Sequence, residues 1–348
     1  MSPRVAIDTM GGDHGPEAVI NGTALAVKNN PNLIPILVGD ETVIKPLLSK
    51  HDVLKGVRIV HTPDAVTSEE KPSAALRSGK NSSMRLAINL VHEGEADATV
   101  SGGNTGALMA MALIVLRTID GIDRPALAAY LPTLQGQCCM LDLGANIDCT
   151  SDNLVQFALM GNAFCRVTSS VKSPTIGLLN VGEEEQKGNA VIRDASAVLM
   201  NPENNLNYYG FIEGNDITAG VVDVVVSDGF SGNIAVKTAE GTATFITRLM
   251  RDSFKSSVLA KIGYLLARFA LKSLRRKLDP QRYNGAVLLG LNGIVVKSHG
   301  SAHPSGVENA IGIAINMITN EFMTDLKTSV RRSIKAVDKA ENALEMGK

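Results

Sequence analysis

Acidic, histidine and glycine residues come together in the stretch IDTMGGDHGP, which begins at Ile7. The apolar run before it is typical of a buried strand, and its proline suits the first turn of a helix. Asp8 and His14 are therefore expected in a glycine-rich loop between a strand and a helix. The acids make this loop a poor phosphate site on its own.

A second loop, SGGNTGA from Ser101, points to anion binding. Its consecutive backbone N–H groups lead into a predicted helix, and N–H groups at a helix N-terminus attract anions. A tight strand-to-helix turn also favours glycine and asparagine for purely structural reasons, so one such loop does not establish a site. The predicted phosphate-binding residues of this loop are Gly103, Asn104, Thr105 and Gly106.

Motifs for binding nucleotides are missing from the sequence. The chain has no GxxxxGK[ST] run, and no GxGxxG follows the first predicted strand. The GGDHGP run carries an acid where a pyrophosphate would lie. These observations disfavour a nucleoside triphosphate or a nicotinamide cofactor and favour a small anion such as free phosphate.

Two further loops combine charge with glycine. NVGEEEQKGN places Lys187 beside three glutamates, which fits a solvated charge cluster or a functional lysine. SDGFSGN places Asp228 and Asn233 at a predicted helix start, where Asp228 could equally be an ordinary N-cap. Each loop therefore keeps a structural and a functional interpretation.

The loop VVKSHGSAHPSG carries Lys297, Ser298 and His299 after another β-rich run. A histidine in a glycine-serine loop at a strand end is more often functional than one on an apolar helix face. Lys297 is the second candidate, with Lys187, for neutralising a bound anion.

Composition describes a globular chain. Its 348 residues are 45% hydrophobic and 20% charged, with a formal net charge of -1, which excludes a general nucleic-acid binder. Four cysteines lack zinc-ligand spacing, no metal site is expected, and Cys138 and Cys139 are predicted to pack on opposite faces of a strand. No signal peptide or spanning helix is predicted, so a reducing cytoplasm is expected.

Short β-rich runs alternate with segments of helical periodicity, as in the segments that begin at Asp97, Met140, Thr175 and Val221. This alternation predicts an α/β fold of parallel βαβ units. Continuous apolar runs are typical of strands covered on both faces. Right-handed crossovers are expected to gather all the polar loops at one edge of the sheet.

Several segments, in order from Asp8 to Ala302, form a larger pattern: DTMGGDHGP, KPSAALRSGKNSSMRLAINLV, SGGNTGALM, LDLGANIDC, LNVGEEEQKG, RDASAVL, SDGFSGN, YNGAVLLGLNG and VKSHGSA. Together they resemble the bacterial phosphate acyltransferases of phospholipid synthesis. One position departs from that family: Gly102 stands where the motif SAGNTG has alanine, which loosens the loop without removing a functional group.

The resemblance implies a reaction, a fold and partners. A long-chain acyl group moves from acyl carrier protein to inorganic phosphate, and the acyl phosphate then feeds a membrane glycerol-3-phosphate acyltransferase. The implied fold is a three-layer α/β/α architecture with a mostly parallel sheet, similar to phosphotransacetylase and the isocitrate dehydrogenase group, usually as a homodimer. Residues 1–348 are expected to form one catalytic domain that needs no metal or organic cofactor.

Roles for the loops follow from the implied reaction. Phosphate is expected on the amides of the SGGNTGA loop, with its charge neutralised by Lys187 or Lys297, while His299 or Asn233 faces the thioester oxygen or the leaving sulfur. The first loop is expected to hold neighbouring loops through their N–H groups or to bind the pantetheine arm. The candidate catalytic residues are Lys187, His299 and Asn233, and the candidate substrate-binding residues are Asp8, His14, Asn146, Asp228 and Ser298.

The segment FKSSVLAKIGYLLARFALKSLRRKL, residues 254–278, departs from the layered pattern. Apolar residues recur at helical spacing with basic residues between them, which predicts an amphipathic helical insertion at residues 250–282. Gly263 would weaken one long helix, so a helix-turn-helix tip is equally expected. The segment could bind an anionic membrane, the acidic carrier protein or a second subunit. The expected contact residues are Leu265, Leu266, Arg268, Phe269 and Lys272.

Two other classes of protein fit part of the sequence. A phosphotransacetylase-like enzyme acting on acyl-CoA would share the phosphate loops. A noncatalytic module that binds carrier protein or lipid would keep the basic helix but show no phosphate-dependent loss of thioester. Comparing activity with acyl-CoA and with acyl carrier protein thioesters separates the two enzymes. Phosphate-dependent loss of thioester separates both from a noncatalytic module.

Overall fold

The computed structural model of the chain describes residues 2–169, 171–277 and 284–332. Strands and helices alternate along most of it. The strands are β1 (Arg4–Asp8), β2 (Ile34–Gly39), β3 (Arg58–His61), β4 (Ala98–Ser101), β5 (Ala126–Thr133), β6 (Gly136–Leu141), β7 (Thr175–Leu179), β8 (Asn207–Ile212), β9 (Val224–Val226), β10 (Ala286–Leu289) and β11 (Ile294–Lys297). The helices are α1 (Gly15–Asn29), α2 (Glu41–Leu48), α3 (Pro72–Ser78), α4 (Ser83–His92), α5 (Thr105–Leu116), α6 (Ser151–Thr168), α7 (Ala190–Leu199), α8 (Gly214–Ala219), α9 (Gly229–Lys255), α10 (Val258–Lys277) and α11 (Pro304–Thr319).

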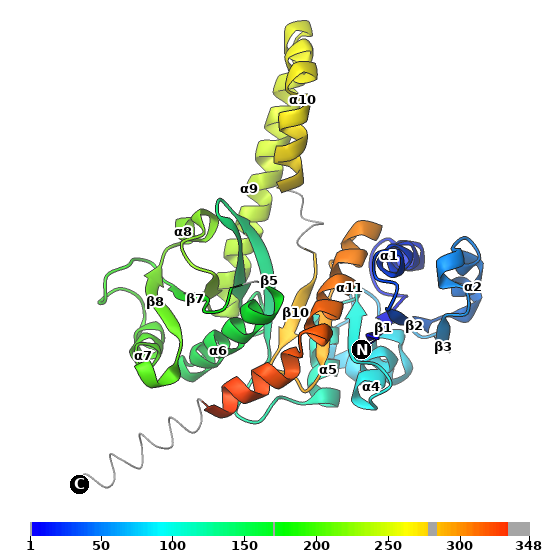
Figure 1. Ribbon diagram of the computed structural model, residues 1–348, viewed down its shortest axis with the longest axis horizontal. Helices are drawn as coiled ribbons and strands as arrows, with labels where there is room; N and C mark the ends of the chain where they lie inside the picture. Colours follow the sequence, from blue (N-terminus) through cyan, green and yellow to red (C-terminus); the bar gives the residue numbers. More distant parts are fainter. Residues whose placement is uncertain (1, 170, 278–283, 333–348) are drawn as a thin grey trace.

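The strands form one mostly parallel sheet in the order β3-β2-β1-β4-β11-β10-β5-β6-β9-β7-β8. Figure 1 shows two halves, with β1 to β4 in one, β7 and β8 in the other, and β5 and β10 between them. Helices cover both faces of the sheet, which confirms the predicted α/β architecture. Among the described residues, no helix combines the length and apolarity needed to cross a membrane.

Strand β1 explains how helices come to cover both faces in the first half. Its side chains alternate, so Val5 and Ile7 share a core with Val19 of α1. Ala6 points the other way and packs in a second cluster with Ala87 of α4. A strand buried on both faces needs apolar residues at successive positions, which is the reason for its continuous apolar run.

Strand β6 repeats this arrangement in the second half. Cys139 belongs to the core that contains Phe157 of α6, whereas Cys138 packs on the opposite face with Val236 of α9. The predicted packing role of the two cysteines is therefore confirmed. Burial raises the pKa of Cys138 to about 12, so its thiol stays protonated near neutral pH and is not a nucleophile.

One prediction about the sheet is wrong: the polar loops do not all lie at one edge. β10 pairs antiparallel with β11 and β5, and β5 pairs antiparallel with β6. β6, β7 and β9 therefore run opposite to β1, β4 and β11. The prediction failed because the crossover rule concerns parallel strands, whereas β5 and β6 form a hairpin. We call the loops after β1, β4 and β11 the first loop cluster, and the loops after β6 and β9 the second loop cluster.

Helices α9 and α10 form a hairpin that stands out from the body of the molecule (Figure 1). The chain turns at residues 256–257 and not at Gly263, so the helix-turn-helix alternative is the one observed. The ring of Phe254 packs edge-on against Tyr264 at 5.5 Å between centroids. The predicted insertion 250–282 starts inside α9, and its last residues, 278–282, lie outside the described part of the chain.

Candidate active site

Asp8, the last residue of β1, organises the first loop cluster. Its Oδ1 accepts the hydroxyl of Ser83 and its Oδ2 accepts the hydroxyl of Ser101, each at 2.6 Å. The N–H of Met10 also donates to Oδ1, at 3.3 Å. Burial raises the pKa of Asp8, while the hydroxyl donors oppose that rise. Asp8 thus holds neighbouring elements together, as expected, but mainly through hydroxyl groups rather than backbone N–H groups.

Lys297 is the last residue of β11. It lies in line with Asp8 and Ser101 across three neighbouring strands, because Ser101 of β4 pairs with both of the others. Its side chain is buried, and Nζ donates to the carbonyl of Gly102 at 3.3 Å and to that of Ser298. Burial lowers the pKa of Lys297 to about 8, against the opposing negative charges of Asp8 and Asp13. A buried cation therefore lies directly beneath the glycine loop.

The predicted phosphate loop begins α5, and the side chain of Asn104 caps that helix. Its Oδ1 accepts the N–H of Ala107 at 3.0 Å, and its Nδ2 donates to the carbonyls of Ser68 and Glu70 at 2.9 Å each. Direct contact of this side chain with an anion therefore requires at least one of these bonds to open. Asn104 instead holds the segment before α3 across the start of α5.

Two backbone donors at the start of α5 have no partner among the described residues. They are the N–H groups of Thr105 and Gly106, whereas the N–H of Gly103 donates to the Ser101 hydroxyl at 3.1 Å. Pro72 packs against Gly106, since a Cβ on Gly106 would come 2.7 Å from its Cγ. Two of the predicted anion donors are thus without a hydrogen-bond partner in the described structure.

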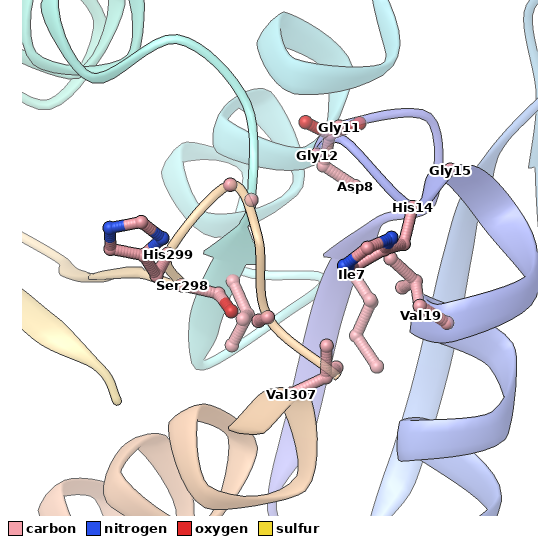
Figure 2. Close-up of a pocket in the computed structure, with 15 residues that line it drawn as sticks. Ile7, Asp8, Gly11, Gly12, His14, Gly15, Val19, Ser298, His299 and Val307 are labelled. Carbon is pink, nitrogen blue, oxygen red and sulfur yellow. The ribbon is translucent and has the colours of Figure 1, made fainter. Parts of the chain in front are cut away.

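Two turns face each other across a pocket on the α1 side of the cluster. Figure 2 shows Gly12 and His14 on one turn and Ser298 and His299 on the other. The N–H of Asp13 ties the turns together by donating to the carbonyl of Gly300 at 2.7 Å. The cavity between the turns measures about 10 Å³, which is roughly the space that one water molecule needs.

His299 turns its ring away from the glycine turn at Gly11–Gly15 (Figure 2). Its Nδ1 accepts the N–H of Ser301 at 3.2 Å. Because a backbone N–H can only donate, the ring proton belongs on Nε2, which makes Nε2 a donor. Burial lowers the pKa of His299, and the positive charges of Lys297 and Lys237 lower it further. His299 is therefore a neutral hydrogen-bond donor that lies within electrostatic reach of α9.

The second loop cluster is built around Asp142, the residue after β6. Asn146 is buried there, and its Nδ2 donates to Asp142 at 2.9 Å and to the carbonyl of Pro125 at 2.8 Å. Asp228 caps α9 by accepting the N–H of Ser231 at 2.8 Å. These contacts favour the N-cap interpretation of Asp228, and they engage the Nδ2 group of Asn146, the other predicted substrate-binding residue, with protein acceptors.

Asn233 is the exposed member of the second cluster. It packs on the turn after β6, where a Cβ on Gly144 would lie 3.5 Å from its Cγ. Lys237, one helical turn further along α9, acts electrostatically on His299. Helix α9 therefore begins at the second cluster, and its residue Lys237 lies within electrostatic reach of His299.

The remaining predicted residues lie away from these contacts. Lys187 is exposed on the loop after β7, where its N–H donates to the carbonyl of Glu184 at 2.9 Å. On α10, Leu266 and Phe269 are exposed, and the guanidinium of Arg268 lies 4.8 Å from the Phe269 ring centroid. The side chain of Lys272 lies outside the described part of the structure.

The first cluster therefore unites most of the predicted site residues but also contains residues that sequence reasoning missed. Ser83 and Ser101 bind Asp8, and Asn284 accepts the N–H of His299 at 2.7 Å and donates to the Ser298 hydroxyl at 2.8 Å. Ser101 precedes the glycine loop directly and could have been found there. Ser83 could not, because its only signal was membership of a long matching segment. The predicted residues that meet here are Asp8, His14, Gly103, Asn104, Thr105, Gly106, Lys297, Ser298 and His299.

Solved structures share this architecture. A phosphotransacetylase from Streptococcus pyogenes superposes with a TM-score of 0.63 at 19% identity, covering 91% of this chain and 94% of that one. A 4-hydroxythreonine-4-phosphate dehydrogenase from Klebsiella pneumoniae gives 0.54 at 14% identity, covering 91% and 100%. At these identities the likeness shows the fold alone, and it confirms the predicted kinship with phosphotransacetylase and dehydrogenase-like folds.

Sequence relatives are much more similar. A phosphate acyltransferase from Rhodospirillum centenum is 56% identical over 315 residues, which is 90% of this chain and 89% of the relative. The model of the family described as fatty acid synthesis protein matches residues 3–325. The chain therefore belongs to the fatty acid synthesis protein family and groups with its phosphate acyltransferases, which makes it an acyltransferase enzyme.

Proposed function

We propose that this enzyme moves a long-chain acyl group from the thioester of acyl carrier protein to inorganic phosphate and releases acyl phosphate. The product would then supply a membrane glycerol-3-phosphate acyltransferase. The observation that carries the proposal is the buried ammonium of Lys297, bonded to the Gly102 carbonyl of the glycine loop. The N–H groups of Thr105 and Gly106, further along the same loop, have no partner among the described residues. A buried cation and helix N-terminal amides together suit a small, doubly charged anion.

The reaction needs no nucleophilic side chain. Phosphate carries a second negative charge near neutral pH, judging from a pKa of roughly 6 for phosphorylated side chains. One of its oxygens attacks the thioester carbonyl, a C–O bond forms, the C–S bond breaks, and the thiolate takes up a proton. Holding phosphate against the thioester can lower the barrier by about 7 to 11 kcal/mol.

His299 is suited to the carbonyl oxygen of the thioester. Its Nε2–H group can donate a hydrogen bond to that oxygen as negative charge develops on it. The ring is neutral, so it adds no charge to the site. One well-placed donor of this kind is worth about 3 to 4 kcal/mol. Asn233, one helical turn before Lys237 on α9, is proposed to contact the leaving sulfur.

Two further contacts with the substrates are also proposed. The pocket between the two turns, with His14 and Ser298 on its wall, is proposed to take a polar part of the pantetheine arm. Lys187 is proposed to join the site only when the donor protein is bound, because its loop follows β7 and forms no hydrogen bond with the first cluster among the described residues. No metal or organic cofactor enters the proposed reaction.

The α9–α10 hairpin is proposed to contact the donor protein, the membrane surface or a second subunit. More than half of the surface of Leu265, Leu266 and Phe269 is exposed, and basic residues lie between them. Such a face suits an acidic carrier or an anionic lipid surface. Leu266→Glu is expected to weaken at least one of these contacts. Light scattering, carrier-protein titration and sedimentation with anionic vesicles tell which.

The first experiment incubates the protein with palmitoyl-acyl carrier protein, with and without inorganic phosphate. Free carrier thiol and acyl phosphate are measured together. Equal amounts of both products, formed only with phosphate, are expected. Lys297→Met should abolish both, while the exposed control Lys55→Met should not.

Three other outcomes contradict the proposal in different ways. Faster reaction with palmitoyl-CoA than with the carrier protein would indicate a phosphotransacetylase-type enzyme. Thiol release without phosphate would indicate a thioesterase. Binding of the carrier protein with no thioester loss would indicate a noncatalytic binding module.

A further inference from the structure

We propose that Ser83, the first residue of α4, is a positioning residue for phosphate. Its hydroxyl fixes Asp8, and Asp8 in turn fixes, through Ser101, the loop whose Gly102 carbonyl binds Lys297. The proposal rests on the proposed function, since it concerns how phosphate is held and attacked.

Ser83 is proposed to act on the site indirectly, through the residue that it hydrogen-bonds. The residue is buried, its N–H donates to the carbonyl of Asp64 at 2.9 Å, and its hydroxyl donates to Asp8 at 2.6 Å. Asp8 lines the pocket that Figure 2 displays, whereas Ser83 does not. Among the described residues, the side-chain bond of Ser83 toward the first cluster is the one to Asp8.

The hydrogen bonds continue from Asp8 to the lysine without a break. Ser101 donates to Asp8 and accepts the N–H of Gly103 at 3.1 Å, so the peptide between them is held at both ends. The carbonyl of Gly102, inside that turn, accepts Lys297 Nζ at 3.3 Å. Because Asp8, Ser101 and Lys297 share one register row on neighbouring strands, a shift of the Asp8 carboxylate is transmitted across the row.

Charge is transmitted along the same path. A hydroxyl donor favours the charged form of a buried carboxylate, and a charged Asp8 favours the ammonium form of Lys297. Within the described residues, the other charged group acting on Lys297 is Asp13, on the turn before α1, and His299 lies two residues further along its own loop. Burial opposes the charged form of both Asp8 and Lys297. Loss of the Ser83 hydroxyl therefore favours neutral forms of both groups.

Ser83→Ala is expected to lower kcat/KM for phosphate about tenfold and to raise KM for phosphate more than KM for the acyl donor. The alkaline limb of the phosphate pH profile should move to lower pH, because Lys297 then loses its proton more easily. Ser83→Thr keeps the hydroxyl and should restore the profile. If Ser83→Ala does not fold, Ser83→Cys provides a weaker donor at the same position.

Ser82 offers a matched control one residue away. It is equally buried, and its hydroxyl donates to the carbonyl of Gly79 at 2.7 Å and accepts the N–H of Arg85 as the cap of α4. No contact joins its side chain to Asp8 in the described structure. Ser82→Ala should therefore lower the melting temperature while leaving the phosphate kinetics within twofold of the wild type.

A double-mutant cycle separates transmission through Asp8 from a general loss of stability. In an Asp8→Asn background, Ser83→Ala should change phosphate kinetics less than twofold, because the carboxylate through which it acts is gone. A full tenfold loss in that background, or equal effects of Ser82→Ala and Ser83→Ala, would overturn the positioning role. An inactive wild-type enzyme would instead overturn the proposed function itself.

Discussion

Two buried aspartates organise the two loop clusters by different means. Asp142 accepts four N–H groups, from the backbones of Leu127, Ala145 and Asn146 and from the Asn146 side chain, at 2.6 to 3.1 Å. Asp8 instead accepts two serine hydroxyls and one long N–H bond. Both lie at the end of a strand, so their chain positions alone do not distinguish them.

This difference in hydrogen-bond donors suggests a structural role for Asp142 and a role in the chemistry for Asp8. Backbone N–H groups are fixed and can only donate, so Asp142 holds its loop in one geometry. Hydroxyls rotate, and a buried lysine lies in the same row as Asp8. The first cluster can therefore change its hydrogen bonding and charge, whereas the second cluster mainly holds the start of α9 in place.

The largest effect is expected from Asp142→Asn. An amide at this position must point its NH₂ group at two N–H donors, whichever way it is turned. Leaving two buried donors without an acceptor should lower the free energy of unfolding by about 2 to 4 kcal/mol. Chemical denaturation measures this loss. Wild-type stability would mean that the N–H contacts of Asp142 carry little energy.

The same change at Asp8, Asp8→Asn, is expected to act on activity rather than stability. The introduced amide can accept one serine hydroxyl and donate to the other, because hydroxyls both donate and accept, so the free energy of unfolding should fall by only about 1 kcal/mol. The negative charge beside Lys297 is lost, however, and kcat/KM for phosphate should fall about thirtyfold at pH 8. A variant as active as the wild type would remove Asp8 from the site.

The pH dependence sharpens this contrast between the two aspartates. Lys297 is proposed to bind phosphate as the ammonium, which is lost as pH rises through its pKa of about 8. In the wild type, kcat/KM for phosphate should therefore fall tenfold per pH unit well above pH 8. Asp8→Asn removes a charge that raises the pKa of Lys297, so its alkaline limb should lie at lower pH. Asp142→Asn should leave the limb unchanged at a temperature where the variant is folded.

Much of this contrast between the two clusters could not be predicted from the sequence. Apolar runs and glycine loops are local patterns, so strands such as β1 and the helix after Pro16 were predicted correctly. Strand direction depends on which strands meet across the sheet, and the antiparallel pairs of β10 with its neighbours left no local mark. The bond between Ser83 and Asp8 joins residues 75 positions apart, where no spacing rule applies.

The predicted site residues fall into two groups: those whose side-chain hydrogen bonds are already made within the fold, and those whose side chains are available to a ligand. Asn104 and Asn146 looked like ligand-binding groups, but their side chains are occupied by backbone carbonyls and caps. Sequence patterns reveal that a polar residue follows a strand and not whether its partners are already supplied. Lys297 was predicted from its loop, whereas its burial depends on the surrounding tertiary structure.

The smallest effect is expected from Asn233, an exposed residue near the start of α9. If the second cluster contributes this one side chain to chemistry, Asn233→Ala should lower kcat about fivefold and leave KM for phosphate unchanged. Thr238→Ala is the control, since Thr238 is exposed on the same helix. The contact on the turn at Gly144 involves one exposed side chain, so stability should change by less than about 0.5 kcal/mol.

The split between kcat and KM decides what this last result means. Phosphate is proposed to bind at the first cluster, so loss of Asn233 should not weaken its binding, whereas a contact with the leaving sulfur matters only as the C–S bond breaks. A rise in KM for phosphate would place Asn233 beside the anion and draw the two clusters into one site. An unchanged kcat would leave the second cluster a purely architectural role, and the contrast between the two aspartates would then be complete.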